Sequence, residues 1–139
     1  MSRSGYSDDC DNLGLWRGAV KRAIDGYRGQ HLLSKLRDAL DVMPEKRLIA
    51  DAIQDESGAV CALGAIDATA PVYEARDLAD HFGIAWALAA EIVYQNDECG
   101  ERYESQDVEG VGRRWTTIHE TPEERWTRMR AWVDSQVER

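Results

Sequence analysis

Apolar residues recur at helical spacing through the first third of the chain. The first stripe consists of Trp16, Val20, Ala23, Ile24 and Tyr27. Its spacing of three and four residues is typical of one face of an amphipathic helix. Gly29 follows this stripe and is predicted to end the helix as its C-terminal cap.

Two further helices are predicted before residue 55. The second has a buried face made of Leu32, Leu33, Leu36, Leu40 and Met43. Pro44 ends it, because the residue before a proline is pushed out of the helical region. The third is expected over "PEKRLIADAIQ", residues 44–54, with Leu48 and Ile53 among its apolar positions and Pro44 in its first turn.

The middle of the chain contains one ambiguous segment and one strong helical pattern. Residues 59–68 fit a short buried helix, but the alternation of Val60, Ala62, Gly64 and Ile66 also fits a strand. Residues 74–95 are rich in alanine and leucine and carry a wide apolar face, which predicts helix with a break at Gly83.

The last third divides into a polar stretch and a terminal helix. Residues 96–120 are acidic, have little periodicity and are predicted to form a long loop. Thr121, Pro122 and Glu124 then form a capping-box pattern, which predicts a helix over 121–138.

These patterns predict a mainly α fold: a compact single domain over 1–139, built as a bundle of five or six helices with one long acidic loop. The N-terminal segment 1–12 shows no periodicity. The longest weakly charged run, residues 82–90, is shorter than the roughly 20 apolar residues of a membrane span. There is no signal-peptide pattern and the three cysteines show no CxxC spacing, so a reduced, cytoplasmic protein is expected.

The charge of the chain indicates which kind of partner this helical domain would prefer. The formal net charge is −9, and the second half, residues 71–139, holds fifteen acidic and only eight basic residues. Such a charge opposes direct binding to nucleic acid and favours either solubility alone or a partner with a basic surface. Trp115 follows Arg113 and Arg114, a combination common in binding anchors. The predicted partner-binding residues are Glu98, Glu101, Glu104, Asp107, Glu109, Arg113, Arg114 and Trp115.

Catalytic chemistry has weaker support in the sequence. Cys61 lies among small apolar residues, where a structural role outweighs that of a nucleophile, and no histidine is near it in sequence. Asp97 and Glu98 are the other candidates. The segments "DDCD" (residues 8–11) and "NDEC" (residues 96–99) mix carboxylate with thiol but lack the ligand spacing of a zinc or calcium site, so neither metal nor cofactor is expected.

Residues 78–92 match the spacing of a DNA-binding helix-turn-helix. The positions that would face the bases, however, are Ala85, Trp86, Ala87, Ala90 and Glu91. None of these side chains is of the basic or amide type that reads base edges. A DNA-binding regulator is therefore the weakest of the functional alternatives.

Several blocks of sequence together resemble a group of small accessory proteins encoded by bacteriophages and prophages. The blocks are "GYSDDCDN", "WRGAVKRAI", "VCALGAIDA", "FGIAWALAAEIVYQNDE" and "TPEERWTRMRAWV". The resemblance implies a phage-related setting in a host cell and brings no catalytic residues with it. Small acidic phage proteins commonly bind and block a host protein.

The sequence thus favours a phage-type protein that binds a host protein stoichiometrically through an acidic surface. Inhibition of a defence or nucleic-acid-directed system, in the manner of an anti-CRISPR, is the form expected. A small enzyme using Cys61, or Asp97 with Glu98, is the alternative, and a helix-turn-helix regulator is the third. The oligomeric state is left open.

Overall fold

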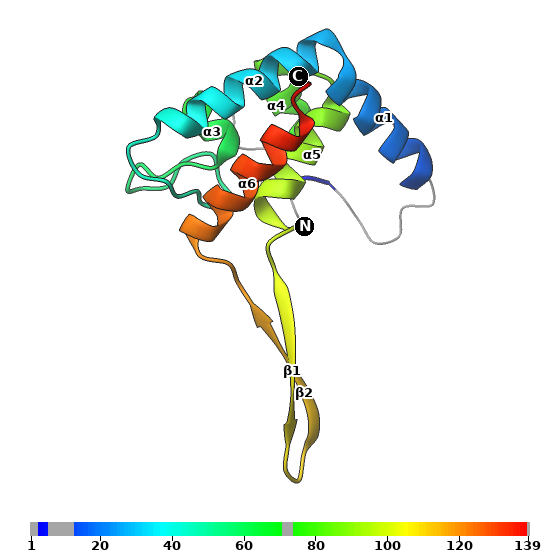
Figure 1. Ribbon diagram of the computed structural model, residues 1–139, viewed down its shortest axis with the longest axis vertical. Coiled ribbons are helices and arrows are strands. Elements are labelled where there is room, and N and C mark those ends of the chain that lie inside the picture. The colour runs from blue at the N-terminus through cyan, green and yellow to red at the C-terminus, as the bar shows by residue number, and fades with distance from the viewer. Residues whose placement is uncertain (1–2, 6–12, 71–73, 139) are drawn as a thin grey trace.

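The computed structural model describes residues 3–5, 13–70 and 74–138 of the chain. The helices and strands in this part are α1 (Leu13–Asp25), α2 (Tyr27–Val42), α3 (Ala62–Ile66), α4 (Ala75–Phe82), α5 (Trp86–Asp97), β1 (Arg102–Val108), β2 (Gly112–Ile118) and α6 (Pro122–Gln136). The helices form one body, and the two strands form a hairpin that projects from it (Figure 1). The predicted mainly helical fold is confirmed, with this hairpin in addition.

The body is organised around α2 and α5. On α2, Leu33, Leu36 and Leu40 are fully buried. Helix α5 packs against α1, α3, α4 and α6, and every residue from 87 to 93 is buried. A helix that is apolar around most of its circumference is stable only inside a core, so α5 forms the centre of the body.

The first two helices are separated at a different position from the one predicted. Helix α1 ends at Asp25 and α2 begins at Tyr27, so Gly29 lies inside α2 and does not cap α1. A Cβ at Gly29 would lie 1.9 Å from the carbonyl oxygen of Ala23. Glycine is needed here because α2 passes directly against the end of α1.

The predicted helix over 44–54 is wrong. This segment is irregular, with several bends, and two of its amides bond outside it: Leu48 N–H donates to the Pro122 carbonyl and Ile49 N–H to that of Val60. Asp51 has a positive φ of 67°, which an α-helix does not accommodate. The apolar residues Leu48 and Ile53 are nevertheless buried, so the pattern identified the core but not the secondary structure.

The helical alternative is the one found in segment 59–68, which contains α3 and only an isolated bridge in place of a strand. Val60 forms an isolated antiparallel bridge with Gln54, and α3 begins two residues later. The break predicted at Gly83 is confirmed: this residue caps α4 in the left-handed region, with φ of 66°, and α5 starts just after it.

The acidic loop predicted over 96–120 is also wrong. Asn96 and Asp97 belong to α5, and most of the remainder forms the antiparallel strands β1 and β2. The terminal helix begins as predicted, since Thr121 and Glu124 form both hydrogen bonds of a capping box at α6. No helix among the described residues is long and apolar enough to cross a membrane.

Candidate functional site

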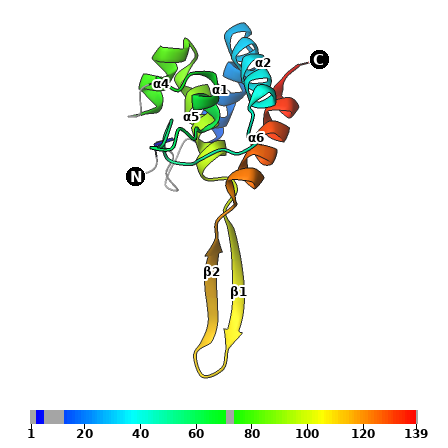
Figure 2. The ribbon, with the colours of Figure 1, turned by 90° about the vertical axis from the view of Figure 1, so that its left-hand side faces the viewer.

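The hairpin formed by β1 and β2, residues 102–118, is called the arm below. Both strands are seven residues long, and all their side chains are exposed except the half-buried Val108 and Ile118. The arm extends away from the helices in two perpendicular views (Figures 1 and 2). A two-stranded hairpin is only marginally stable by itself. Because this one buries almost none of its side chains, burial in the core does not explain why it is present.

The turn at the tip of the arm is set by glycine. Val111 N–H donates to the Val108 carbonyl at 3.0 Å, and Gly110 between them has φ of 82°. A type II turn requires a positive φ at this position, which glycine adopts without steric cost. The turn leaves Val111, 57% exposed, at the far end of the molecule.

One face of the arm carries two exposed aromatic side chains. Ser105 pairs with Trp115, and Tyr103 pairs with Thr117 two positions away. Paired residues share a face and side chains alternate along each strand, so Tyr103 and Trp115 lie diagonally on the same face. They are 64% and 66% exposed. Trp115 was identified from the sequence, but Tyr103 was not. Tyr103 is identified by the strand pairing, which places it on the same face as Trp115.

The predicted acidic residues are distributed over the arm and its base. Asp107 forms an ion pair of 3.6 Å with Arg113 on the aromatic face, and Glu101 lies 3.5 Å from His119 at the base. Glu104 lies on the opposite face, with Arg114 on the neighbouring strand, and Glu109 lies in the turn.

Glu98 differs from the other predicted residues because it belongs to the body. It is the C-cap residue of α5, is half-buried, and accepts a hydrogen bond of 2.7 Å from Ser4 Oγ. The structure therefore places seven of the eight predicted partner-binding residues on the arm or at its base and assigns Glu98 a structural contact.

The base of the arm is held by a network of partly buried charged residues. Arg128 binds the Glu120 carboxylate at both oxygens, with Nε–Oε2 at 2.9 Å and Nη2–Oε1 at 2.6 Å, and Arg125 Nε lies 3.2 Å from Oε1. Both arginines also donate to the Asn96 carbonyl near the C-terminus of α5. Glu120 directly follows the arm, so these contacts fix the arm to α5 and α6.

Gly100 completes this base on the other strand. A Cβ added at Gly100 would lie only 1.9 Å from Glu120 Cδ. Any side chain here would displace the carboxylate that Arg125 and Arg128 hold. The arm is thus fixed at its root. Along their length, β1 and β2 contact mainly each other.

Cys61 has a structural role. It is 1% exposed and is the N-cap residue of α3, where its Sγ accepts the Gly64 N–H at 3.4 Å. The histidines have other contacts: His81 pairs with Asp67, His119 with Glu101, and His31 stacks on Tyr27. The described residues thus do not form the cysteine–histidine pair that nucleophilic catalysis needs.

Asp97 is also occupied by structural contacts. Its side chain is 2% exposed and binds Arg3 through both oxygens, at 2.7 and 2.9 Å. Oδ1 also accepts from the Asp51 amide and from Asn96 Nδ2. Burial acts to raise the pKa of Asp97, but these donors outweigh it and hold the pKa below its usual value. A carboxylate with its lone pairs filled is poorly suited to act as a base.

The helix-turn-helix spacing corresponds to α4 and α5, but α5 is not available to DNA. Ala87, Ala90 and Glu91 are buried, and the Glu91 carboxylate forms an ion pair with the exposed Arg17. Trp86 packs edge-on against Trp16, with ring centroids 5.1 Å apart. Of the two cysteine–carboxylate segments, residues 8–11 lie outside the described residues, and the described ones contain no group of three or more potential metal ligands.

Comparison with known proteins adds no relative to this description. No protein-family model matches the chain, and no match is found among curated proteins or among solved structures. The candidate site therefore stands on its own geometry.

Proposed function

We propose that this protein acts by binding a protein partner stoichiometrically, with the arm as the binding element. The observation that supports this is the contrast between a fixed root and an exposed length. Gly100 and Glu120 hold the root against the body, while both faces of the strands are open to solvent. Folding of the body gains little from such an element, whereas a partner gains a rigid surface to dock on.

The aromatic face supplies anchors for such a partner. Tyr103 and Trp115 are each about two-thirds exposed and lie on one side of a short ribbon. Tyrosine and tryptophan are enriched among the residues that dominate binding energy when a partner covers them. The outer edges of β1 and β2 also offer unpaired backbone groups, to which a partner strand can add.

Charge favours a partner with a basic surface. The chain carries a net charge of −9, most of it outside the arm: Glu104 and Glu109 project from the arm, whose three acidic residues are equal in number to its three arginines. Long-range attraction of this kind accelerates association and weakens as salt rises. A host protein that handles nucleic acid, or one of a defence system, has the required basic surface, and binding would inhibit it by covering that surface.

Pull-downs from host lysate at roughly 50 and 300 mM salt test this proposal, because salt screens charge attraction over this range. Wild type should retain one partner in stoichiometric amount at low salt, and Trp115→Ser with Tyr103→Ser should lose it. Glu104→Gln with Glu109→Gln should weaken capture and reduce its salt dependence. Leu15→Ser is the matched control, since Leu15 is 75% exposed on the body.

The unfolding free energies of these variants should agree with wild type within about 0.5 kcal/mol, because surface substitutions change stability little. Equal capture by wild type and by the double aromatic variant would contradict the role of the arm. Loss of capture in Leu15→Ser alone would place the interface on the body instead.

A further inference from the structure

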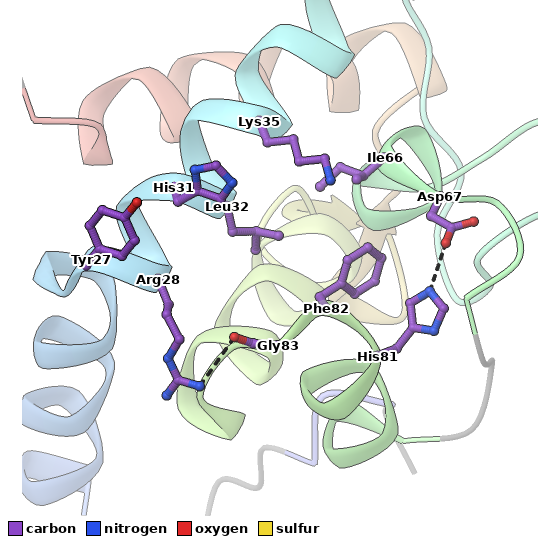
Figure 3. A pocket seen from close by; sticks show the side chains of 10 residues that line it. All are labelled: Tyr27, Arg28, His31, Leu32, Lys35, Ile66, Asp67, His81, Phe82 and Gly83. Atoms are coloured by element: carbon purple, nitrogen blue, oxygen red, sulfur yellow. Dashed lines mark hydrogen bonds and ion pairs between the residues drawn. The ribbon is translucent and has the colours of Figure 1, made fainter.

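A concave surface lies on the helical body, between α2 and the C-terminal ends of α3 and α4 (Figure 3). We call it the α2 groove. Its volume is about 420 Å³, which lies within the range of small-molecule sites. Helix α2 lies at the end of the body away from the arm in both views (Figures 1 and 2), so this surface is separate from the one proposed for the partner.

One wall of the α2 groove is basic, in a protein that is strongly acidic overall. Arg28, His31 and Lys35 follow one another at spacings of three and four residues, which places them on one face of α2. All three are exposed and line the groove. Local charge of this sign, against a net charge of −9, marks a place where an anion is attracted.

Two of these cations have donors to spare. The Arg28 guanidinium makes one long hydrogen bond, 3.4 Å from Nη1 to the Gly83 carbonyl. Within the described residues, Lys35 makes no hydrogen bond or ion pair, and its side chain extends along the groove toward Ile66 (Figure 3). An incoming anion would therefore complete the pairing of these groups without breaking an existing salt bridge.

The opposite wall contains one carboxylate, which is already engaged. Asp67 lies 2.8 Å from His81 Nε2 and accepts the Thr69 hydroxyl at 2.6 Å and the Thr69 amide at 2.9 Å. The Thr69 contacts and His81 lower the pKa of Asp67 to about 2. Asp67 is thus occupied with its own neighbours rather than with Lys35 or Arg28.

The floor between these walls is apolar. Leu32 comes from α2, Ile66 from the end of α3 and Phe82 from the end of α4. The Phe82 ring lies near the middle of the groove in Figure 3, and His81 packs edge-on against it at 5.0 Å between ring centroids. A ligand for this surface needs an anionic group for one wall and a flat or apolar portion for the floor.

We propose that the α2 groove binds a small organic phosphate, with the phosphate on Lys35 and the apolar portion on Phe82 and Leu32, while Arg28 lies at the other end of the groove beside Gly83 (Figure 3). Phosphate fits Lys35 better than a carboxylate does, because it offers three terminal oxygens and up to two charges to the three N–H donors of the ammonium group. The site is independent of the arm and of the function proposed for it.

Calorimetric titration tests the site, with adenosine 5′-monophosphate as the probe and adenosine and inorganic phosphate as its two halves. The monophosphate should bind, and each half should bind more weakly or not at all. Lys35→Met should weaken the monophosphate about tenfold, the loss expected for one charge-assisted hydrogen bond. Lys21→Met is the control, because Lys21 is exposed on α1, outside the α2 groove, and forms an ion pair with Asp25.

Circular dichroism of both variants establishes that they fold. Failure of the monophosphate to bind at millimolar concentration would overturn the proposal, as would equal weakening by Lys35→Met and Lys21→Met. Inorganic phosphate binding as tightly as the monophosphate would overturn the part assigned to Phe82 and Leu32. The arm variant Trp115→Ser should bind the monophosphate normally, so failure of one proposal leaves the other testable.

Discussion

The helical body and the arm are stabilised in different ways, although the arm continues directly from α5 and leads into α6. The body buries an apolar core in which Leu36, Leu88 and Ile92 are fully enclosed. The arm buries almost nothing and depends on its strand pairing and on the contacts of Glu120 at its root. Stability and binding are therefore carried by different residues, which allows each to be changed separately.

The largest effect should come from opening the core of the body. Leu36→Ala removes a side chain with no exposure and should lower the free energy of unfolding by about 3 kcal/mol, through lost burial and the cavity that remains. Urea denaturation followed by circular dichroism measures this loss. The arm variant Trp115→Ser is the comparison, since it should change the same quantity by less than about 0.5 kcal/mol.

A loss of similar size in both variants would mean that Trp115 contributes to the core. That result would remove the distinction between the two regions and, with it, the argument that the arm is present for binding.

An effect of similar size is expected where the body binds its own N-terminal segment. Asp97→Asn leaves the Arg3 guanidinium buried without its counter-ion and should cost about 3 kcal/mol at neutral pH. The pKa of Asp97 is lower in the folded state than in the unfolded chain, so its contribution is complete above the unfolded pKa near 4. This contribution is lost as the pH falls through the lower, folded pKa.

Urea titrations at a series of pH values from about 6 to 2 measure this dependence, because the range includes the unfolded pKa of an aspartate, near 4, and extends below it. Wild type should lose stability more steeply than Asp97→Asn on acidification, and the two curves should converge at the acid end. Parallel curves over the whole range would show that Asp97 does not titrate differently in the folded state, and that the Arg3 contact contributes little.

The success of sequence reasoning also differs between the two regions. Thr121 with Glu124 and the break at Gly83 were predicted correctly, because capping and a left-handed glycine are local properties of the chain. The helix over 44–54 was predicted wrongly, because the amides of Leu48 and Ile49 bond to segments far away in sequence. Apolar spacing could show that these residues are buried but not which backbone groups they meet.

The arm was missed for the opposite reason. A strand is recognised by alternation between a buried and a solvent face, and both faces of the arm are open, so β1 shows no alternation. The available signal was the turn "EGV" between two seven-residue segments, one of which, "GRRWTTI", is rich in β-branched and aromatic residues. The exposed charges and Trp115 were identified from composition alone, which does not depend on secondary structure.

The α2 groove shows a third limit. The spacing of Arg28, His31 and Lys35 is visible in the sequence and places these side chains together on one helix. The wall that faces them comes from Asp67 and His81, and the packing of α3 against α2 and of α4 against α5 brings the two sides together. The charge pattern on one helix predicts a basic helix face. Whether that face lines a groove depends on the elements packed opposite it.

The smallest effect on stability, and the sharpest test of the comparison, is expected where the arm joins the body. Gly100→Ala places a methyl group where Glu120 Cδ lies, so the carboxylate must leave Arg125 and Arg128. The stability loss should be about 2 kcal/mol, because hydrogen bonds to charged groups contribute roughly 1.5–3 kcal/mol and this network is only partly buried. Gly14→Ala is the matched control, because a Cβ there meets nothing within 4 Å.

Hydrogen exchange separates the two regions in this variant. Amides paired between β1 and β2 should exchange faster in Gly100→Ala, since a loosened root frees a hairpin that is marginal by itself. The exchange rates of core amides in α2 and α5 should rise only by the amount that the small loss of global stability accounts for. If arm and core amides respond equally, the arm unfolds with the body as one cooperative unit, and the root is part of the core. If only the arm responds, the Glu120 network is what turns a marginal hairpin into a fixed binding element.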